Sequence, residues 1–304
     1  MMSLSVNVCG VEFKNPIITA SGTFSYGIEF LEYFDVNRLG GITLKGISIN
    51  PKKGNLTPRI AEVESGIINS IGLENIGYYD FVKKKLPIIK ERLKNTVVIA
   101  NVFGSKVEDY VDICEKFDNT DCISFIELNV SCPNVKEGGI AFGQDEKVLA
   151  GLIKSVRKVV KNKKLIVKLS PNVSDISNFA YICQEEGSDA ISLINTIRAM
   201  RIDIKKGRPV LANTIGGLSG PAIKPIAIRM VYEVAKKIKI PIIGMGGVMN
   251  GLDVVEFLMA GASLVAVGTA NLLNPIYSLK ILDEFSDYMS ENNLSASEII
   301  GKAL

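Results

Sequence analysis

Short apolar runs alternate with longer amphipathic segments along nearly the whole chain. The runs are rich in β-branched residues, as is typical of buried strands; in order they are PIITA, GITLK, VVIANV, ISFIELNV, LIVKLS, AISLINT, PIIGMGG and LVAVGTA. Between most of them, apolar residues recur every three or four positions, which predicts helices. Eight runs in this alternation predict an α/β fold, a (β/α)8 TIM barrel rather than an open sheet.

Two stretches depart from the alternation. LSVNVCGVEF, residues 4–13, precedes the first run and predicts an N-terminal hairpin that closes the bottom of the barrel. Residues 47–68 alternate in ISI and RIAEV, which predicts a hairpin insertion after strand 2. Since no linker or low-complexity tract interrupts the chain, residues 1–304 are expected to form a single domain.

Capping signals mark the start of two helices. Ser105 with Glu108 forms a capping-box pattern directly after NVFG, and Ser295 with Glu298 repeats it near the C-terminus. Each pair predicts a helix that begins immediately after its serine.

Composition and charge narrow the class of protein. Apolar residues make up 47% and charged residues 22%, with 35 basic residues against 32 acidic ones, which is typical of an ordinary globular protein. This near-neutral balance favours neither nucleic acid nor an acidic membrane as a partner. The N-terminus lacks a signal-peptide pattern and no run of 18 apolar residues occurs, so a cytoplasmic location is expected.

The chain contains no histidine, which excludes Ser-His and Cys-His pairs and every metal site that uses histidine. Its five cysteines are an odd number without CxxC spacing, so we expect reduced thiols and no metal. Four of them are expected in ordinary structural places, two on helix faces, one at the start of a buried strand and one in the terminal hairpin: Cys114, Cys183, Cys122 and Cys9.

Cys132, in ELNVSCPNVKEGG, is instead expected on a loop at the barrel mouth. Pro133 restrains the backbone after it, and Gly138-Gly139 gives the loop a hinge that would let it close over a ligand. Nearby cations would lower the pKa of its thiol from the free value of about 8.5. Both a catalytic and a structural role are compatible with these features.

Polar residues end the apolar runs, and the carboxyl ends of barrel strands build the active site of this fold. GMGGV and VGTAN, at strands seven and eight, place glycines and backbone N–H groups where a phosphate binds in such barrels, and GLSGPA, residues 217–222, can add further donors. Tight turns are the alternative explanation for these glycines. Lys45 and Lys168 also end apolar runs, which predicts an anionic ligand between them.

These motifs, taken in order, closely resemble the FMN-containing dihydroorotate dehydrogenases. The resemblance covers nearly the whole chain and rests on SGTF, TLKG, NSIGLEN, NVSCPNVKEGGIAFG, IVKLSPN, LINT, GLSGPA, GMGGV and VGTA. It implies the same barrel, bound FMN, and oxidation of dihydroorotate to orotate in the synthesis of UMP. Cysteine at position 132, where the membrane-bound class has serine, indicates class 1.

Within class 1, the segments VKEGGIAFG, RIAE and NSIGLEN resemble class 1B. That class implies a partner subunit carrying FAD and a 2Fe-2S cluster, electrons passed to NAD, and a heterotetramer with two copies of each chain. This chain has neither the grouped cysteines of a cluster nor an early GxGxxG. Class 1A, a homodimer that uses fumarate, is the alternative.

The resemblance also assigns residues, motif by motif. It implies that FMN is bound by Ser21, Lys45, Gly46, Asn101, Asn129, Lys168, Ile194, Gly220, Gly246, Gly247, Gly268 and Thr269. It implies that dihydroorotate is bound by Lys45, Asn69, Ser70, Ile71, Gly72, Leu73, Asn129, Asn195 and Thr196. Cys132 is then expected to remove the C5 proton as a base while C6 delivers hydride to the flavin, near which Lys168 would stabilise negative charge.

Two rival interpretations use the same barrel. A tRNA-dihydrouridine synthase also has FMN and a loop cysteine, but it would favour a basic surface or an additional helical domain, and this chain has neither feature. A non-catalytic barrel that binds a phosphate ligand would leave Cys132 and the two lysines without a role. Flavin absorbance in the purified protein would argue against that second rival.

Overall fold

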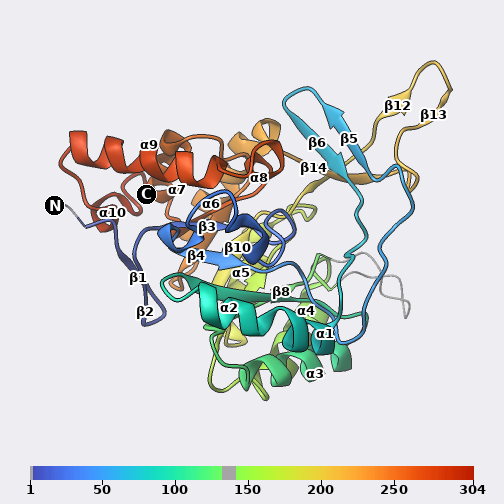
Figure 1. Ribbon diagram of the computed structural model, residues 1–304, viewed down its shortest axis with the longest axis horizontal. Helices are drawn as coiled ribbons and strands as arrows, with labels where there is room; N and C mark the ends of the chain where they lie inside the picture. Colours follow the sequence, from blue (N-terminus) through green and yellow to red (C-terminus); the bar gives the residue numbers. More distant parts are fainter. Residues whose placement is uncertain (1–2, 132–141) are drawn as a thin grey trace.

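A closed barrel of parallel strands forms the centre of the computed structural model, which describes residues 3–131 and 142–304 (Figure 1). The prediction of a (β/α)8 barrel is confirmed, and each of the eight apolar runs supplies one strand. In order around the barrel they are β3 (Ile17–Thr19), β4 (Gly41–Thr43), β7 (Val97–Val102), β8 (Phe125–Asn129), β9 (Lys164–Lys168), β10 (Ala190–Leu193), β15 (Ile242–Met245) and β16 (Leu264–Val267).

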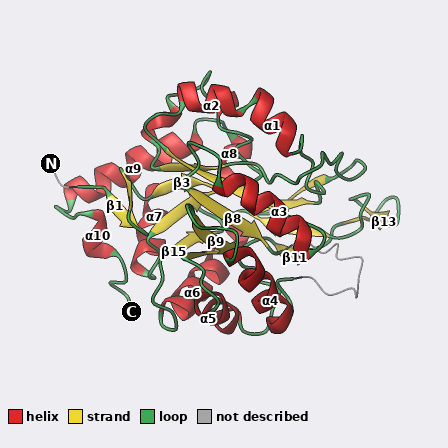
Figure 2. Cartoon of the chain, turned by 90° about the horizontal axis from the view of Figure 1, so that it is seen from below, coloured by secondary structure: helices red, strands yellow, loops and turns green. Residues whose placement is uncertain are grey.

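Helices surround the strands, as Figure 2 shows. Each contains buried residues, and they are α1 (Tyr78–Lys84), α2 (Leu86–Arg92), α3 (Val107–Asp118), α4 (Glu146–Arg157), α5 (Ile176–Glu185), α6 (Lys224–Ala235), α7 (Gly251–Met259), α8 (Ala270–Leu273), α9 (Tyr277–Glu291) and α10 (Ala296–Ile299). Between β3 and β4 the described chain has only two 3₁₀ turns, η1 (Ile28–Phe30) and η2 (Val36–Arg38), and a third, η3 (Pro221–Ile223), precedes α6.

The predicted N-terminal hairpin is present as β1 (Val6–Val8) and β2 (Val11–Phe13), and it closes the bottom of the barrel. The ring of Phe13 is fully buried with its centroid 5.7 Å from that of Phe125, near the start of β8. The thiol of Cys9, in the hairpin turn, donates a hydrogen bond of 3.2 Å to the backbone carbonyl of Asp189, just before β10. The packing of Phe13 and the hydrogen bond of Cys9 therefore attach the hairpin to this end of the barrel.

The predicted hairpin after the second barrel strand is also present, as β5 (Ile60–Val63) and β6 (Gly66–Asn69). Two strands that the sequence did not predict extend it into a four-stranded sheet in the order β11-β14-β6-β5, namely β14 (Gly216–Ser219) and β11 (Ile197–Ala199). A short pair, β12 (Ile202–Asp203) and β13 (Arg208–Pro209), follows β11. This sheet projects from the opposite end of the barrel to β1 and β2 (Figures 1 and 2).

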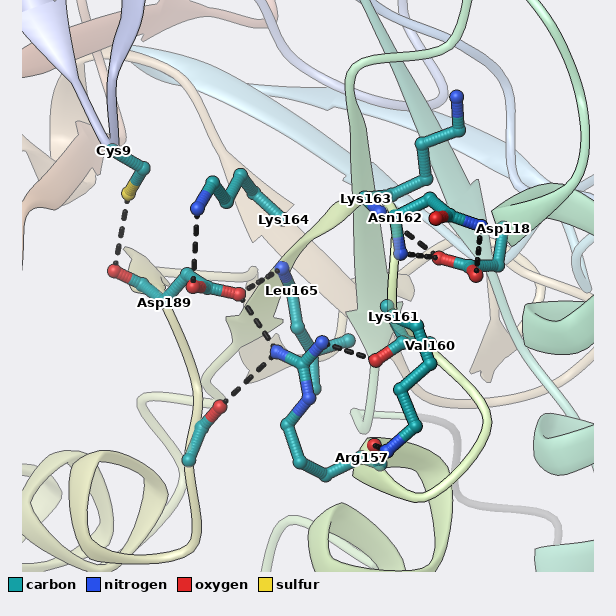
Figure 3. Close-up of polar contacts among 11 residues, drawn as sticks. Cys9, Asp118, Arg157, Val160, Lys161, Asn162, Lys163, Lys164, Leu165 and Asp189 are labelled. Carbon is teal, nitrogen blue, oxygen red and sulfur yellow. Dashed lines mark hydrogen bonds and ion pairs between the residues drawn. The ribbon is translucent and has the colours of Figure 1, made fainter.

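Charged side chains at the bottom of the barrel fasten the starts of strands, as the close-up in Figure 3 shows. The Asp189 carboxylate accepts hydrogen bonds from the backbone N–H of Leu165 at 2.7 Å and from the Arg157 guanidinium at 2.8 Å. The Asp118 carboxylate accepts from the N–H groups of Asn162 and Lys163, both at 2.9 Å. These carboxylates are saturated by the protein itself, so their role at this end is structural.

The two predicted helix starts differ in outcome. Ser295 and Glu298 form the expected capping box before α10, and the Ser295 N–H donates to the Glu298 carboxylate at 2.7 Å. The prediction for Ser105 and Glu108 is wrong by one residue. The N-cap of α3 is Lys106, and Asp109 accepts from the N–H groups that precede the helix. The residue at which the helix begins determines which acidic side chain can accept from the backbone N–H groups before the first turn.

Candidate active site

A buried polar network crosses the barrel interior close to its mouth. Glu127, on β8, is 2% exposed, and its Oε1 accepts a hydrogen bond of 2.6 Å from Nδ2 of Asn101 on β7. Its Oε2 accepts a bond of 2.7 Å from the hydroxyl of Ser192 on β10. Alternation along the strands turns these three side chains inward together with that of Asn129, two residues after Glu127. One carboxylate thus joins three barrel strands beneath the mouth.

The amide oxygen of Asn101 is the unsatisfied atom of this network. Asn101 is fully buried, and its Oδ1 has no hydrogen-bond partner among the described residues. A Cβ built on Gly46, which follows β4 at the mouth, would lie 2.8 Å from that oxygen. Position 46 therefore has no room for a side chain beside this oxygen, and a buried acceptor without a protein donor is the arrangement that a ligand donor would satisfy.

The two predicted lysines lie at the ends of two barrel strands, β4 and β9, that β7 and β8 separate. Lys168 is the last residue of β9 and only 6% exposed, with its Cα opposite Asn129 on one side and Ser192 on the other. Lys45 follows β4, and its N–H donates to the carbonyl of Ser25 at 2.7 Å. In the described part of the chain neither ammonium group forms a hydrogen bond or ion pair. A buried ammonium without an anionic partner is suited to a negatively charged ligand.

Asparagine side chains meet at the ends of β8 and β10. Nδ2 of Asn195 donates to Oδ1 of Asn129 at 3.4 Å, and Oδ1 of Asn195 accepts from the N–H of Thr196 at 2.7 Å. Asn172, which the sequence did not single out, donates to the carbonyl of Thr196 at 3.0 Å and to the hydroxyl of Ser170 at 3.1 Å. The structure thus brings three predicted residues together and adds a support beneath Thr196.

Glycines at the ends of β14 and β15 form a cradle of closely spaced backbone. Gly220, Gly246 and Gly247 all have positive φ angles, of 106°, 129° and 80°. A Cβ on Gly247 would lie 2.8 Å from the carbonyl oxygen of Gly220 and 3.0 Å from the backbone nitrogen of Lys224, at the start of α6. The predicted donors from the GLSGPA and GMGGV motifs are therefore adjacent, and no side chain fits between them.

Residues after β16 complete this side of the mouth. The Thr269 hydroxyl donates to that of Ser219 at 2.9 Å, which links the end of β16 to β14. Ala20, directly before Ser21, donates its N–H to the carbonyl of Val267, and a Cβ on Gly268 would lie 3.6 Å from the Ala20 side chain. The predicted residues Ser21, Gly268 and Thr269 are accordingly neighbours, and Ile194 packs beside Gly246.

The predicted substrate residues 69–73 lie at the end of β6 and directly after it, in the four-stranded sheet outside the barrel. Nδ2 of Asn69 donates to the carbonyl of Gly217 at 3.4 Å, and the packing of Gly217 against Thr196 joins this strand to the mouth. The hydroxyl of Ser70 is buried without a partner in the described chain. Ile71 and Gly72 lie against Asn55, and Leu73 has a positive φ of 58°. Asn69 therefore has the most direct connection to the mouth.

Cys132 lies outside the described residues, so its predicted position on a mouth loop stays a prediction. The residue before it, Ser131, has a buried hydroxyl without a partner among the described groups. The hydroxyl of Tyr110 donates to the carbonyl of Asn129 at 2.8 Å and so holds the backbone at the end of β8, just before Ser131.

The other four cysteines are free thiols. Burial, reinforced by the Asp189 carboxylate, raises the pKa of Cys9 to about 11. Burial also raises the pKa of Cys114 and of Cys183, both fully buried on helices as predicted. The expected strand position of Cys122 is wrong, since it is exposed in the loop before β8. Partial desolvation of its thiol still raises the pKa of Cys122, so none of these four favours a thiolate.

Sequence patterns missed Glu127, Ser192, Asn172 and Ser219. Glu127 did carry a signal, because it is the charged residue inside the apolar run ISFIELNV. The partners of all four depend on strand register and on the extra sheet, which local patterns do not reveal. Among the residues described, no cluster of His, Cys, Asp and Glu could hold a metal ion. No described helix is long and apolar enough to cross a membrane.

Comparison with known proteins gives a consistent result. The family model described as dihydroorotate dehydrogenase matches residues 3–289. A protein of Geobacter metallireducens is 49% identical over 299 residues, which are 98% of this chain and 97% of that protein. A protein of Geobacter sulfurreducens is 50% identical over 98% of this chain and 97% of that protein. A protein of Lachnoclostridium phytofermentans is 49% identical over 99% of each chain. All three are named dihydroorotate dehydrogenase B (NAD(+)), catalytic subunit.

Proposed function

Since the chain belongs to the dihydroorotate dehydrogenase family, we propose that its barrel mouth oxidises dihydroorotate to orotate in pyrimidine biosynthesis. It is an oxidoreductase of the NAD-linked type B, and FMN is its cofactor. The observation that carries this conclusion is identity of 49 to 50% with type B catalytic subunits along nearly the full length of both chains. Family membership also favours dihydroorotate over tRNA as the substrate.

The residues at the mouth fit FMN. The closely spaced backbone of Gly220, Gly246 and Gly247 offers N–H groups that would suit a phosphate, and none of the three carries a side chain that could block its approach. On the opposite side, the buried Oδ1 of Asn101 lacks a donor and Lys168 lacks an anion within the described chain. A flavin ring carries both N–H and carbonyl groups, so it would satisfy these two residues together. The remaining FMN contacts are proposed at Ser21, Lys45, Gly46, Asn129, Ile194, Gly268 and Thr269.

Dihydroorotate is proposed to bind between the asparagines at the mouth and the strand β6. Asn129, Asn195 and the backbone N–H of Thr196 are already connected by hydrogen bonds, so the two side-chain amides are held in place for a carboxylate and a ring amide. Asn69 approaches them through Gly217, and Lys45 supplies positive charge for the carboxylate. Residues 70–73 complete the proposed substrate site.

The proposed chemistry divides between the chain and its cofactor. When bound, FMN accepts the hydride from C6 of dihydroorotate. Cys132 takes the proton from C5 as a general base, because histidine is absent from the sequence and the four described thiols have raised pKa values. Lys168, buried at the end of β9, stabilises the negative charge that develops at the flavin.

The electrons are proposed to leave through a separate subunit that carries FAD and a 2Fe-2S cluster and reduces NAD. The word subunit in the names of the relatives supports a separate partner. We propose a heterotetramer with two of each chain, in the cytoplasm, in which residues 1–304 of this chain act as one FMN-binding domain.

Anaerobic mixing of the purified FMN-loaded chain with dihydroorotate tests this function. Absorbance of oxidised flavin near its visible maximum should bleach, and orotate should appear in equal amount, because one hydride leaves each substrate molecule. Uridine in place of dihydroorotate is the control and should leave the flavin oxidised. A yellow protein that dihydroorotate fails to bleach would refute the proposed function.

A further inference from the structure

Glu127 is a buried carboxylate that the proposed mechanism does not use. It lies inside the barrel at the end where ligands bind, 2% exposed, with hydrogen bonds from Asn101 at 2.6 Å and Ser192 at 2.7 Å. No described cation lies within ion-pair distance of it. Burying a charge is costly unless it is well bonded, and an apolar residue could join the same three strands by packing alone. The carboxylate therefore calls for an explanation beyond the fold.

The hydrogen bonds of Glu127 determine how Asn101 is oriented. An ionised carboxylate accepts hydrogen bonds and donates none, so only the Nδ2 of Asn101 can face it. The reverse orientation would place two oxygens 2.6 Å apart. Oδ1 is consequently turned to the other side, toward Gly46, where it is buried without a donor among the described residues. The Oε1 acceptor of Glu127 thus decides that Asn101 presents an acceptor to the mouth.

We propose that Glu127 is a positioning residue, which holds Asn101 so that Oδ1 accepts the N3–H of the flavin ring. In the oxidised ring N3 carries the single N–H donor, and a buried acceptor without a donor among the described residues is its complement. The inference rests on the proposed function because it requires FMN at this mouth. Its consequence is specific: Glu127 controls which flavins bind, through Asn101, without touching the flavin itself.

A purely structural role for Glu127 makes a different prediction, and Asp118 provides the comparison. Asp118 is also a buried carboxylate, 3% exposed, but it lies at the bottom of the barrel and accepts hydrogen bonds from the backbone of Asn162 and Lys163. Neutralising Asp118 removes a charge and weakens the fold without reaching the mouth. Asp118→Asn is therefore a matched control for Glu127→Gln.

The experiment measures binding of FMN and of N3-methyl-FMN to the flavin-free protein by fluorescence titration. The wild-type chain should prefer FMN by about tenfold, the value of one buried hydrogen bond, with any steric effect of the methyl group added. In Glu127→Gln the amide can both donate and accept, so Asn101 can adopt either orientation. The hydrogen-bond part of the preference should then fall to about twofold while the steric part stays, whereas Asp118→Asn should keep the full wild-type preference.

The outcomes separate the inference from the function on which it rests. A wild-type chain that does not bind FMN refutes the proposed function. A wild-type preference for FMN that Glu127→Gln leaves unchanged overturns the inference alone, and so does an equal loss in Glu127→Gln and Asp118→Asn. If Glu127→Gln does not fold, as circular dichroism would show, Glu127→Met decides. It removes the acceptor that holds Nδ2 of Asn101 and should reduce the preference, and an unchanged preference in that variant overturns the inference.

Discussion

Single residues at the two ends of the barrel differ in how fully their polar groups are satisfied. At the bottom, the carboxylates of Asp189 and Asp118 are saturated by backbone and side-chain donors. At the mouth, Lys168 and the Oδ1 of Asn101 are buried and have no partner among the described residues. Because buried polar groups normally find partners, the unsatisfied end is the one arranged for a ligand.

The proposed base gives the sharpest prediction at this scale. Cys132→Ala should retain FMN, because the proposed flavin contacts are made by other residues. It should slow flavin reduction by dihydroorotate by about 10² to 10⁴, the usual effect of losing a general base. Stopped-flow absorbance under anaerobic conditions measures this rate.

Cys122 supplies the matched control, since it is an exposed thiol in the loop before β8. Cys122→Ala should reduce FMN at the wild-type rate. If Cys132→Ala also does so, another group removes the C5 proton and the assignment of the base is wrong.

At the scale of elements, what the sequence predicted depends on how local the signal is. Buried parallel strands are continuous apolar runs, so all eight barrel strands were predictable. β14 was not, because Gly216 and Gly217 interrupt any such run and its partner β6 lies far away in sequence. The site divides in the same way. Motif residues at strand ends were found, whereas the role of Glu127 appears only when register places Asn101 and Ser192 beside it.

The extra sheet supports the substrate site, and Gly217 is where the two meet. A Cβ at this position would overlap the side chain of Thr196, so Gly217→Ala must displace either β14 or Thr196. We expect a loss of about 1 to 3 kcal/mol in unfolding free energy, as for other overpacked sites, and a raised KM for dihydroorotate. Urea denaturation and steady-state kinetics measure the two effects.

Gly151 in α4 is the control for this substitution, because a Cβ there meets nothing within 4 Å. Gly151→Ala should leave KM unchanged and, as an alanine in a helix, should stabilise the fold by up to about 1 kcal/mol. A wild-type KM in Gly217→Ala would show that the sheet does not position Thr196.

For the whole molecule, the question is how electrons leave FMN after dihydroorotate has reduced it. The described residues contain no group of side chains able to hold a metal, and the four described cysteines are dispersed over the hairpin, two helices and a loop. A 2Fe-2S cluster needs four grouped ligands, usually thiolates. The described residues therefore offer no cluster site, and the proposed function places the electron acceptor, a small molecule or a partner protein, outside this chain.

Acceptor specificity distinguishes these two routes. The isolated FMN-loaded chain, reduced with dihydroorotate, should be reoxidised slowly by fumarate and by NAD, because the type B relatives are named catalytic subunits and NAD-linked. Adding the co-expressed flavin and iron-sulfur subunit should make NAD reduction rapid and leave the fumarate rate unchanged. NADH absorbance and flavin absorbance follow the two reactions. Rapid turnover of fumarate by the chain alone would instead identify a self-sufficient enzyme of class 1A and refute the proposed partner, since electrons would then leave directly from the barrel mouth.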